Sequence, residues 1–490
     1  MVMDNTNDLA VLLASQYPLL LVEAQEEERL LEVIRQAAER LDVPVWTWSA
    51  TRGLAKDGHH AQYQTIDPHV ALEFVGDLSG PGVFVFADVH PLLTDPLVIR
   101  RIKEVAQRAR RGQTLVLTGP RTEVPPEIES LAHQWSLKPP TRDELSALVK
   151  RTLETFAARS FPVVVNAAEV EQMVNALLGL TITEAERLIQ HAALRDGQIS
   201  PADIPALRTA KAELLNADGI LELVEADVGT LDTIGGLDGL KSWLRLRRRV
   251  MISDDALPGL DPPRGVLLTG VPGCGKSLVA KTLAHTWGLP LVLLDPSRLY
   301  SKYIGESEQR LSAALATVEA MAPAVLWIDE IEKGLAASGD GDGGVSKRLL
   351  GTFLRWMQER RGEVFMVATA NDVSGLPPEL LRRGRFDEIF FVDLPGTDER
   401  ARILSIHLSK RGQDPGRFDL SPLVAGSEGF SGAELETVVV GALYRAFADQ
   451  GDLTTDSLMK ELTATVPLSV SRREDVEALR AWADGRAVFA

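Results

Sequence analysis

The sequence has a single cysteine, Cys274, among its 490 residues. One cysteine cannot form a disulfide within the chain, and no Cys/His cluster has the spacing of zinc ligands. No apolar run approaches the roughly 20 residues that span a bilayer. The acidic start, residues 1–8, differs from a basic and apolar export signal. These absences predict a chain that works in a reducing compartment, the cytoplasm, without a membrane.

Positive charge is scarce as well. The sequence has 52 basic and 69 acidic residues, a net charge of −17. This sign repels a phosphate backbone, so nucleic acid is an unlikely partner unless a local basic patch overrides it. The densest basic cluster is Lys241, Arg245, Arg247, Arg248 and Arg249. It is interpreted as a solvated helix face or a subunit contact, with nucleic-acid binding as the weaker alternative.

Short apolar runs alternate with helical stretches along the sequence, a pattern that is typical of α/β proteins. After Pro395 the strand signal stops and helices take over. We therefore expect a parallel sheet of the P-loop type over 233–396 and a helical lid subdomain with a C-terminal helix over 397–490. The strands expected in this half are 265–269, 290–294, 325–329, 364–369 and 388–393.

The first half repeats this order in eroded form, and residues 179–186 (GLTITEAE) echo residues 429–436 (GFSGAELE). We expect a degenerate α/β module of the same kind over 1–215 and a linker over 216–232. The alternative is two unrelated α/β domains. The expected strands are 19–22, 43–48, 83–88 and 115–118, followed by helices from 142 to about 215.

The second half contains a phosphate-binding loop between an expected strand and an expected helix. The motif G-x-x-x-x-G-K-[ST] lets backbone N–H groups curl around phosphate oxygens and directs a helix N-terminus at the anion. Lys276 is expected on the β- and γ-phosphates and Ser277 on Mg²⁺. The nucleotide-binding residues expected here are Gly270, Val271, Pro272, Gly273, Cys274, Gly275, Lys276, Ser277 and Leu278.

A second motif, residues 325–330 (VLWIDE), is an apolar strand that ends in two carboxylates. Asp329 is expected to hold the Mg²⁺ coordination sphere, and Glu330 to polarise the attacking water as a general base. Together the two motifs predict a nucleoside triphosphatase. The front module reads VEAQEE at the corresponding loop, residues 22–27, without lysine or glycine, so we expect it neither to bind nor to hydrolyse ATP.

With these motifs the region 232–470 resembles the AAA family of ATPases. The resemblance implies Ile234 and Gly235 beside the adenine, Asn371 as the residue that helps to place the lytic water, and arginine fingers that reach a neighbouring subunit. It therefore implies a homohexamer that uses ATP and Mg²⁺. The remaining residues that it assigns are the fingers Arg382 and Arg385, His407 near the ribose and adenine, and Gly432 and Ala433 under the adenine.

Residues 352–359 (TFLRWMQE) and 384–395 (GRFDEIFFVDLP) are similar to AAA proteins that plastid genomes encode as a hypothetical reading frame. This resemblance covers the whole chain and implies the plastid stroma if the chain is plastid-encoded. It names no client. At Gln358 the sequence departs from the aspartate common in AAA proteins, so signalling between subunits can follow another route.

Residues 301–308 (SKYIGESE) resemble the loop that lines the central pore of AAA rings, which assigns Lys302, Tyr303 and Ile304 to a protein substrate. Burial of Tyr303 in the core is the alternative. The Asp/Gly-rich stretch 339–344 is expected to be a flexible loop. Cys274 is interpreted as a small loop-filling residue, with a redox brake as the weaker alternative.

Three functions remain open from the sequence. The first is a hexamer that remodels or threads proteins. The second is a regulatory switch or assembly factor that binds a specific partner or adaptor through the front module. The third, a nucleic-acid motor, is disfavoured by the charge. An H-E-x-x-H string does not occur, so a built-in zinc protease is excluded.

Overall fold

The computed structural model describes residues 5–24, 26–57, 59–109, 112–119, 124–216, 219–224, 229–252, 260–299, 306–335, 345–360, 363–382 and 384–490. The chain divides into two compact units. The first consists of Met1–Thr152 and Leu180–His191, and the second of Leu153–Gly179 and Ala192–Ala490.

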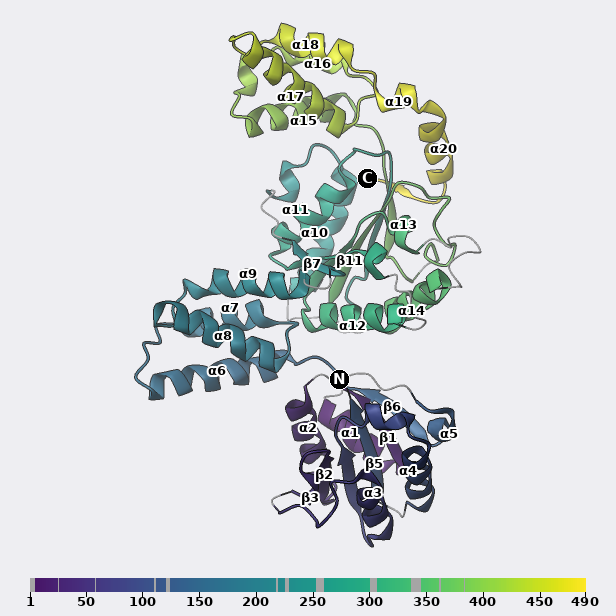
Figure 1. Cartoon of the computed structure of the whole chain (residues 1–490). Helices are drawn as coiled ribbons and strands as arrows, with labels where there is room; N and C mark the ends of the chain where they lie inside the picture. The colour runs from purple at the N-terminus through teal and green to yellow at the C-terminus, as the bar shows by residue number, and fades with distance from the viewer. Residues whose placement is uncertain are drawn as a thin grey trace. The chain divides into compact units, whose positions relative to one another are not determined.

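The first unit contains a six-stranded sheet in the order β3-β2-β4-β5-β1-β6 (Figure 1). Neighbouring strands are parallel except β2 and β3, which form an antiparallel pair. Apolar side chains of α1 and α2 bury one face, and those of α3 and α4 bury the other. The elements are α1 (Asn5–Ala14), β1 (Leu19–Glu23), α2 (Glu27–Glu39), β2 (Val45–Ser49), β3 (Gly53–Lys56), α3 (Pro68–Asp77), β4 (Gly82–Phe86), η1 (His90–Thr94), α4 (Pro96–Arg108), β5 (Gln113–Gly119), α5 (Pro126–Glu129) and β6 (Ala132–Ser136).

Four helices follow this sheet in the chain. Helix α7 packs against α9, and a single parallel bridge joins Val163 to Ile199. Helix α8 begins with a capping box in which the Thr181 N–H and hydroxyl both donate to Glu184. The helices are α6 (Arg142–Ala158), α7 (Ala167–Leu177), α8 (Ile182–Asp196) and α9 (Asp203–Asn216).

The second unit contains a seven-stranded sheet in the order β13-β12-β8-β11-β10-β9-β7, again parallel except at β7 and β9. Helices α10 and α11 bury one face, and α12 and α14 bury the other. The elements are β7 (Leu221–Val224), η2 (Leu231–Thr233), α10 (Asp238–Ile252), β8 (Gly265–Gly270), α11 (Lys276–Trp287), β9 (Leu291–Leu294), η3 (Pro296–Leu299), α12 (Glu306–Ala320), β10 (Ala324–Ile328), α13 (Ile331–Leu335), α14 (Val345–Glu359), β11 (Val364–Ala370) and β12 (Glu388–Val392).

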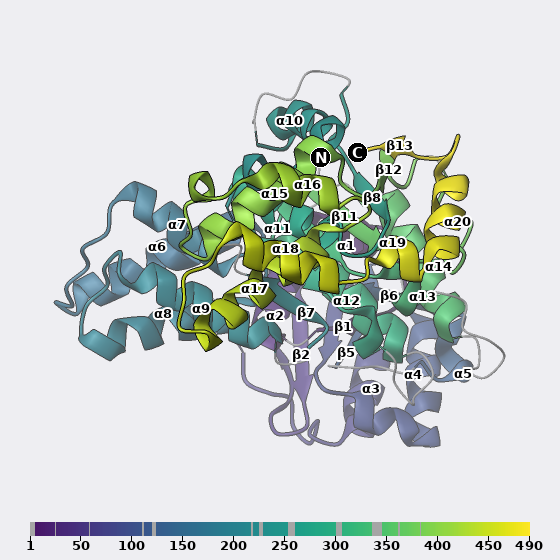
Figure 2. The same ribbon diagram turned by 90° about the horizontal axis from the view of Figure 1, so that it is seen from above.

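A separate core holds the helices that follow β12 together (Figure 2). Helices α15 to α18 supply it, and the chain then returns to the sheet through α19, α20 and the edge strand β13. The elements are α15 (Thr397–Lys410), η4 (Pro415–Arg417), α16 (Leu420–Gly426), α17 (Gly432–Ala448), α18 (Thr455–Ala464), α19 (Leu468–Ser471), α20 (Arg473–Ala483) and β13 (Val488–Phe489).

The two sheets have the same strand order. Strands β2, β4, β5, β1 and β6 correspond in turn to β9, β10, β11, β8 and β12. Each sheet also has an antiparallel strand at the same edge, but β3 follows β2 in the chain whereas β7 precedes β8. The expected fold class, an AAA-type parallel sheet with a helical lid preceded by a degenerate α/β module of the same kind, is confirmed.

Three details differ from the sequence prediction. Strand β7 lies inside the segment 216–232 that was expected to be a linker, and it pairs with β9. Strands β3 and β6 were not expected, because both are short and only partly apolar. The C-terminal region, expected to be a helical lid with a C-terminal helix, ends instead in the strand β13, where the Ala490 N–H donates to the Phe391 carbonyl at 3.1 Å.

Candidate ATP site

The phosphate-binding loop connects β8 to α11, and its glycines adopt backbone angles that other residues rarely adopt. Gly270 has φ +130°, Gly273 has φ +77° and Gly275 has φ +92°. A Cβ atom on Gly270 would lie 2.1 Å from the Val392 carbonyl oxygen. Glycine is therefore required at this turn both by conformation and by space. The loop delivers the N-terminus of α11, with its free N–H groups, to the end of β8.

Lys276, the first residue of α11, is buried beneath this loop. Its Nζ donates hydrogen bonds to the carbonyls of Gly270 at 2.8 Å and Val271 at 2.9 Å. Burial lowers the pKa of Lys276 to about 8. The ammonium group is thus held by the loop itself, at the position where a phosphate would compete for it.

Ser277 and Asp329 lie side by side. The Ser277 hydroxyl donates to Asp329 Oδ1 at 2.9 Å, and the Thr369 hydroxyl donates to the same oxygen at 2.6 Å. A hydroxyl and a carboxylate oxygen are ligands that suit Mg²⁺, which usually takes its other ligands from water and phosphate. The chemistry and proximity of these oxygens therefore fit the expected magnesium site.

Glu330 follows Asp329 with a left-handed backbone, φ +49°. Its N–H donates to the Thr369 hydroxyl at 3.0 Å, and the Asn371 side chain donates to Glu330 Oε1 at 2.7 Å. Lys333 pairs with the other carboxylate oxygen. The hydrogen bond from Lys333 lowers the pKa of Glu330, which keeps the carboxylate ionised as a general base requires.

The sequence analysis missed two residues of this group, Thr369 and Glu332. Glu332 is buried, and its Oε1 accepts hydrogen bonds from the N–H groups of Asn371 at 2.9 Å and Asp372 at 3.3 Å. Its other oxygen, Oε2, is buried without a hydrogen-bond partner in the described part of the chain. For Glu332 the only available signal in the sequence was a third acidic residue two positions after Glu330, with Ile331 between them.

Small residues from three segments meet beside the phosphate loop. The Ala433 N–H donates to the Gly273 carbonyl at 3.0 Å. A Cβ on Gly273 would lie 3.1 Å from the Ala433 side chain, and one on Gly235 would lie 2.6 Å from Ile403. The structure therefore brings the expected adenine-contacting residues Gly235, Gly432 and Ala433 to one place, where side chains are kept small.

Lys241 does not lie on the solvated face expected for the basic cluster. It is buried, and its Nζ donates to the carbonyl of Ile234 at 2.6 Å. Burial lowers the pKa of Lys241. The helix α10 thus holds the Ile234–Gly236 segment in position through a buried lysine. The other basic residues of the cluster are partly or fully exposed, with Arg245 bound to Asp232.

His407 and Cys274 complete the expected nucleotide-binding set. The His407 Nδ1 lies 3.7 Å from Glu436, and burial lowers the pKa of the imidazole. Burial raises the pKa of the Cys274 thiol to about 12. A thiol that stays protonated is a poor nucleophile, so the redox alternative for Cys274 has no support from its surroundings.

The two expected arginine fingers lie on the connection between β11 and β12. Arg382 is exposed, and the Arg385 guanidinium donates to the carbonyl of Glu379. Among the described contacts, neither arginine is joined to Lys276, Asp329 or Glu330 of the same chain. The expected pore residues Lys302, Tyr303 and Ile304, and the glycine-rich stretch 339–344, lie outside the described residues.

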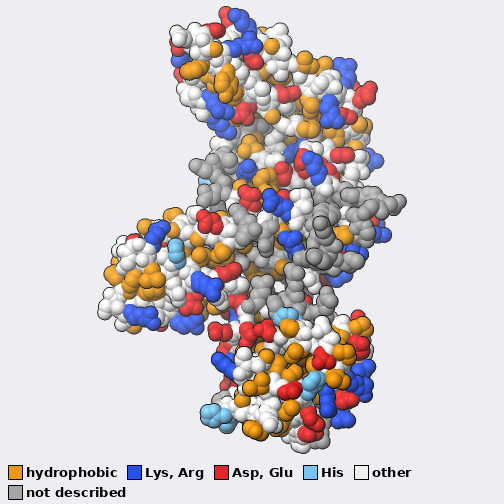
Figure 3. Space-filling model, in the orientation of Figure 1, with side chains coloured by type: hydrophobic (Ala, Val, Ile, Leu, Met, Phe, Trp, Pro, Cys, Tyr) orange, Lys and Arg blue, Asp and Glu red, His pale blue; other side chains and the backbone are white. Residues whose placement is uncertain are grey.

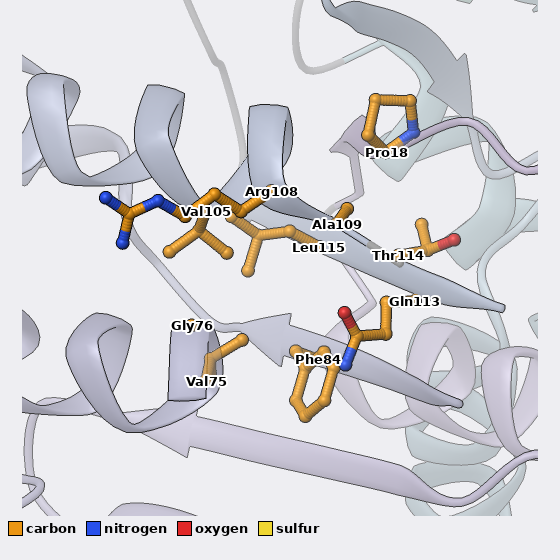
Figure 4. A pocket seen from close by; sticks show the side chains of 10 residues that line it. All are labelled: Pro18, Val75, Gly76, Phe84, Val105, Arg108, Ala109, Gln113, Thr114 and Leu115. Carbon is orange, nitrogen blue, oxygen red and sulfur yellow. The ribbon is translucent and has the colours of Figure 1, made fainter. Parts of the chain in front are cut away.

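The described residues also form two cavities away from the phosphate loop, one of about 160 Å³ lined by Leu21, Glu23 and Trp135 among others, and a smaller one. The smaller cavity, of about 10 Å³, lies between α3, α4 and the strands β4 and β5, with Phe84, Val105 and Gln113 in its lining (Figure 4). It holds at most one water molecule. Acidic and basic side chains are mixed over the face shown in Figure 3. Within the described ranges, no helix is both long enough and apolar enough for a bilayer crossing.

Family models match three stretches of the chain. Residues 5–137 match the N-terminal domain and residues 143–218 the second domain of SpoVK-like AAA ATPases. Residues 266–394 match the ATPase family associated with various cellular activities, AAA. The expected division placed 1–215 in one module, whereas these models divide it in two.

Similar proteins that match most or part of the chain also carry AAA-type names. The uncharacterised AAA domain-containing protein ycf46 of Pyropia yezoensis is 33% identical over 99% of both chains. Its counterpart in Guillardia theta is 34% identical over 98% of this chain and 95% of the relative. A proteasome-activating nucleotidase of Pyrococcus horikoshii is 35% identical over 45% of this chain and 57% of the relative. With an intact phosphate loop and carboxylate pair, the protein belongs to the AAA ATPases, within the family of ycf46 AAA domain-containing proteins.

Proposed function

We propose that the protein is a ring-forming ATPase that remodels protein substrates. The observation that carries this proposal is the separation of its catalytic parts. Hydrogen bonds link Ser277 through Asp329 and Thr369 to Glu330 and Asn371, whereas Arg382 is exposed and no described contact joins it to this group. An exposed arginine that has no described contact with its own site can serve the site of a neighbouring copy.

Within one site, each residue has a role that its contacts support. Lys276 leaves the loop carbonyls to bind the β- and γ-phosphates, and Glu330 accepts the proton of the attacking water while Asn371 keeps that carboxylate oriented. Ser277 and Asp329 would hold Mg²⁺, which supplies charge neutralisation on the phosphates when bound. Ile234, Gly235, Gly432 and Ala433 form the surface for the base.

The role of the arginines in a neighbouring copy is tested by mixing two inactive variants. Lys276→Ala has a disabled site and intact fingers, and Arg385→Ala has an intact site and a missing finger. If the finger acts between subunits, mixed rings regain ATP hydrolysis at seams that join an intact site to an intact finger. An Arg385→Ala protein with the full rate, independent of protein concentration, would contradict the proposal.

Threading is tested separately at the pore loop. A Tyr303→Ala variant is expected to keep ATP hydrolysis and to lose both stimulation by unfolded casein and unfolding of a tagged reporter protein. The name of the Pyrococcus relative, a proteasome-activating nucleotidase, makes a protein substrate the first class to test. Unchanged unfolding by the variant would exclude a threading role for Tyr303.

One observation favours the second function, a switch that binds a specific partner through the front module. Tyr63 is 86% exposed and Ile66 is 57% exposed on the segment between β3 and α3. This segment is held in place, because Trp48 Nε1 donates to the Thr65 carbonyl at 2.7 Å and the Leu54 N–H donates to the Thr65 hydroxyl at 2.9 Å. An ordered segment that presents an aromatic side chain is suited to docking a protein.

The two functions can be distinguished by identifying which proteins co-purify with a hydrolysis-defective variant of this protein. In a Glu330→Gln background, a switch loses its one folded partner on Tyr63→Ala and keeps it on Tyr303→Ala. A remodeller loses its unfolded clients on Tyr303→Ala and keeps them on Tyr63→Ala, because these clients depend on the pore loop.

A further inference from the structure

The first unit carries a carboxylate where the ATPase half carries its phosphate loop. Strand β1 corresponds to β8, and α2 follows it as α11 follows β8. Glu26 immediately precedes α2, the place that Gly275 takes before α11. The Glu26 side chain is only 9% exposed.

Both oxygens of Glu26 are engaged. The N–H of Ile182, the first residue of α8, donates to Glu26 Oε1 at 2.7 Å. The Arg29 guanidinium donates to Glu26 Oε2 at 3.2 Å. Both partners belong to the same compact unit as Glu26. The carboxylate thus joins the start of α2 to the start of α8, which lies 156 positions further along the chain.

Arg29 extends this junction to a third helix. Its Nε and Nη2 donate to Glu144 of α6 at distances of 3.2 to 3.3 Å, and its Nη1 donates to the Lys138 carbonyl at 2.8 Å. The Arg29 side chain is also only 9% exposed. A largely covered arginine between two carboxylates retains its charge and favours a defined geometry.

The helix that Glu26 contacts begins like the helix that contacts the phosphate loop. Gly179 before α8 and Gly429 before α17 both have left-handed angles, φ +88° and +82°. The capping box of Thr181 and Glu184 repeats that of Ser431 and Glu434. Helix α17 then faces the phosphate loop through Ala433 and Gly273. The two helix starts therefore hold equivalent places in the two halves.

A helix N-terminus carries a partial positive charge that a negative group stabilises. In the ATPase half, phosphate would supply that charge to α11, whereas in the first unit Glu26 makes no side-chain cap hydrogen bond to α2 and accepts instead from the start of α8. We propose that the Glu26 carboxylate, with Arg29 as counter-ion, supplies the negative charge at the start of α8 from within the chain and keeps α2, α6 and α8 joined without a ligand. The junction of these three helices is consequently independent of nucleotide, and the first unit serves as a fixed platform.

Hydrogen–deuterium exchange of the full-length protein tests this. We compare Glu26→Ala with Glu27→Ala, which removes the same charge from an exposed neighbour in the first turn of α2. In Glu26→Ala, peptides covering 142–150 and 180–190 should exchange at least about tenfold faster, because charge-assisted hydrogen bonds are lost. Peptides covering β1 and β5 should not change, and ATP should not alter exchange at 180–190 in the unsubstituted protein.

A second variant, Glu26→Gln, guards against a general loss of folding. It keeps an oxygen that can accept from Ile182 and removes the charge opposite Arg29, so we expect an increase in exchange of about threefold at 180–190. The proposal is overturned if Glu26→Ala matches Glu27→Ala or if Glu26→Gln matches the unsubstituted protein. It is also overturned if ATP slows exchange at 180–190.

Discussion

The two sheets of this chain have the same strand order and different chemistry. After β8 a glycine-rich turn surrounds a buried lysine, whereas the helix after β1 is preceded by the largely covered carboxylate of Glu26. The order of strands depends on apolar runs that both halves retain. Phosphate binding depends on a few residues in one turn, so it can be lost while the fold persists.

The residues that follow β4 and β10 also show that the backbone is alike in the two halves and the side chains differ. Asp88 follows β4 by two residues with φ +51°, as Glu330 follows β10 with φ +49°. Ala87 therefore stands where Asp329 stands, so the front module has lost the carboxylate expected to hold Mg²⁺ and kept one at the place of the expected base. The backbone bend thus remains in a module without the rest of the site.

The largest expected effect is on the rate of ATP hydrolysis, and it should distinguish Glu330 from its counterpart Asp88. Glu330→Gln should lower the rate of ATP hydrolysis by about 10²- to 10⁴-fold, because it removes the carboxylate proposed as the general base. The matched variant Asp88→Asn should leave the rate unchanged. Steady-state phosphate release measures both. A comparable loss in Asp88→Asn would mean that the front module contributes to hydrolysis and would break the comparison.

Glu332 is expected to have a smaller effect, because it acts through Asn371. Glu332→Ala leaves the N–H groups of Asn371 and Asp372 without their acceptor, and the misplaced Asn371 should lower kcat by about 10- to 100-fold with little change in KM. Glu332→Gln, which keeps an acceptor oxygen, should recover most of kcat. An equal loss in both variants would contradict a positioning role.

Two buried lysines of the second unit, Lys211 in α9 and Lys276 in α11, differ in their expected role and can be compared through stability. Burial lowers the pKa of both Lys211 in α9 and Lys276 to about 8. Since the unfolded chain binds a proton more tightly than this, burial of Lys211 costs up to about 3 kcal/mol below pH 8, and the cost disappears as the pH rises towards 10.5.

Lys211→Met should therefore raise the Tm by several degrees at pH 7 and by little at pH 10, as measured by thermal unfolding. Lys276→Met should instead abolish ATP binding, because we propose that this ammonium group binds the β- and γ-phosphates. A Tm gain for Lys211→Met that is the same at both pH values would show that the benefit comes from packing and not from removal of a charge.

The smallest expected effect concerns an element that follows the lid and lacks a counterpart in the strand order of the first sheet. Arg480 of α20 forms a bidentate pair with Asp393, with contacts of 2.9 to 3.0 Å, and β13 then joins the sheet edge. Both side chains are partly exposed, so Arg480→Ala should destabilise the second unit by less than about 1 kcal/mol. A loss several times larger in chemical denaturation would show that the pair holds the C-terminal segment on the sheet.

More of the strands and site residues were predicted correctly from the sequence in the second half of the molecule than in the first. Strands β8 to β12 and the group around Lys276, Asp329 and Glu330 were expected because buried parallel strands and the phosphate loop both leave strong local patterns. Strands β3, β6 and β7 were missed, because edge strands bury one side or less and their patterns resemble those of loops.

The sequence by itself determined the class of fold, the nucleotide chemistry and the absence of a lysine from the front module's first turn. Its local patterns suffice for these, because a strand, a turn and a helix start are each encoded within a few residues. Tertiary structure alone decided that Glu332 supports Asn371, that Lys241 is buried under Ile234, and that Glu26 receives the start of α8. Such partners depend on which distant segments the packed core brings together, and no local pattern records that.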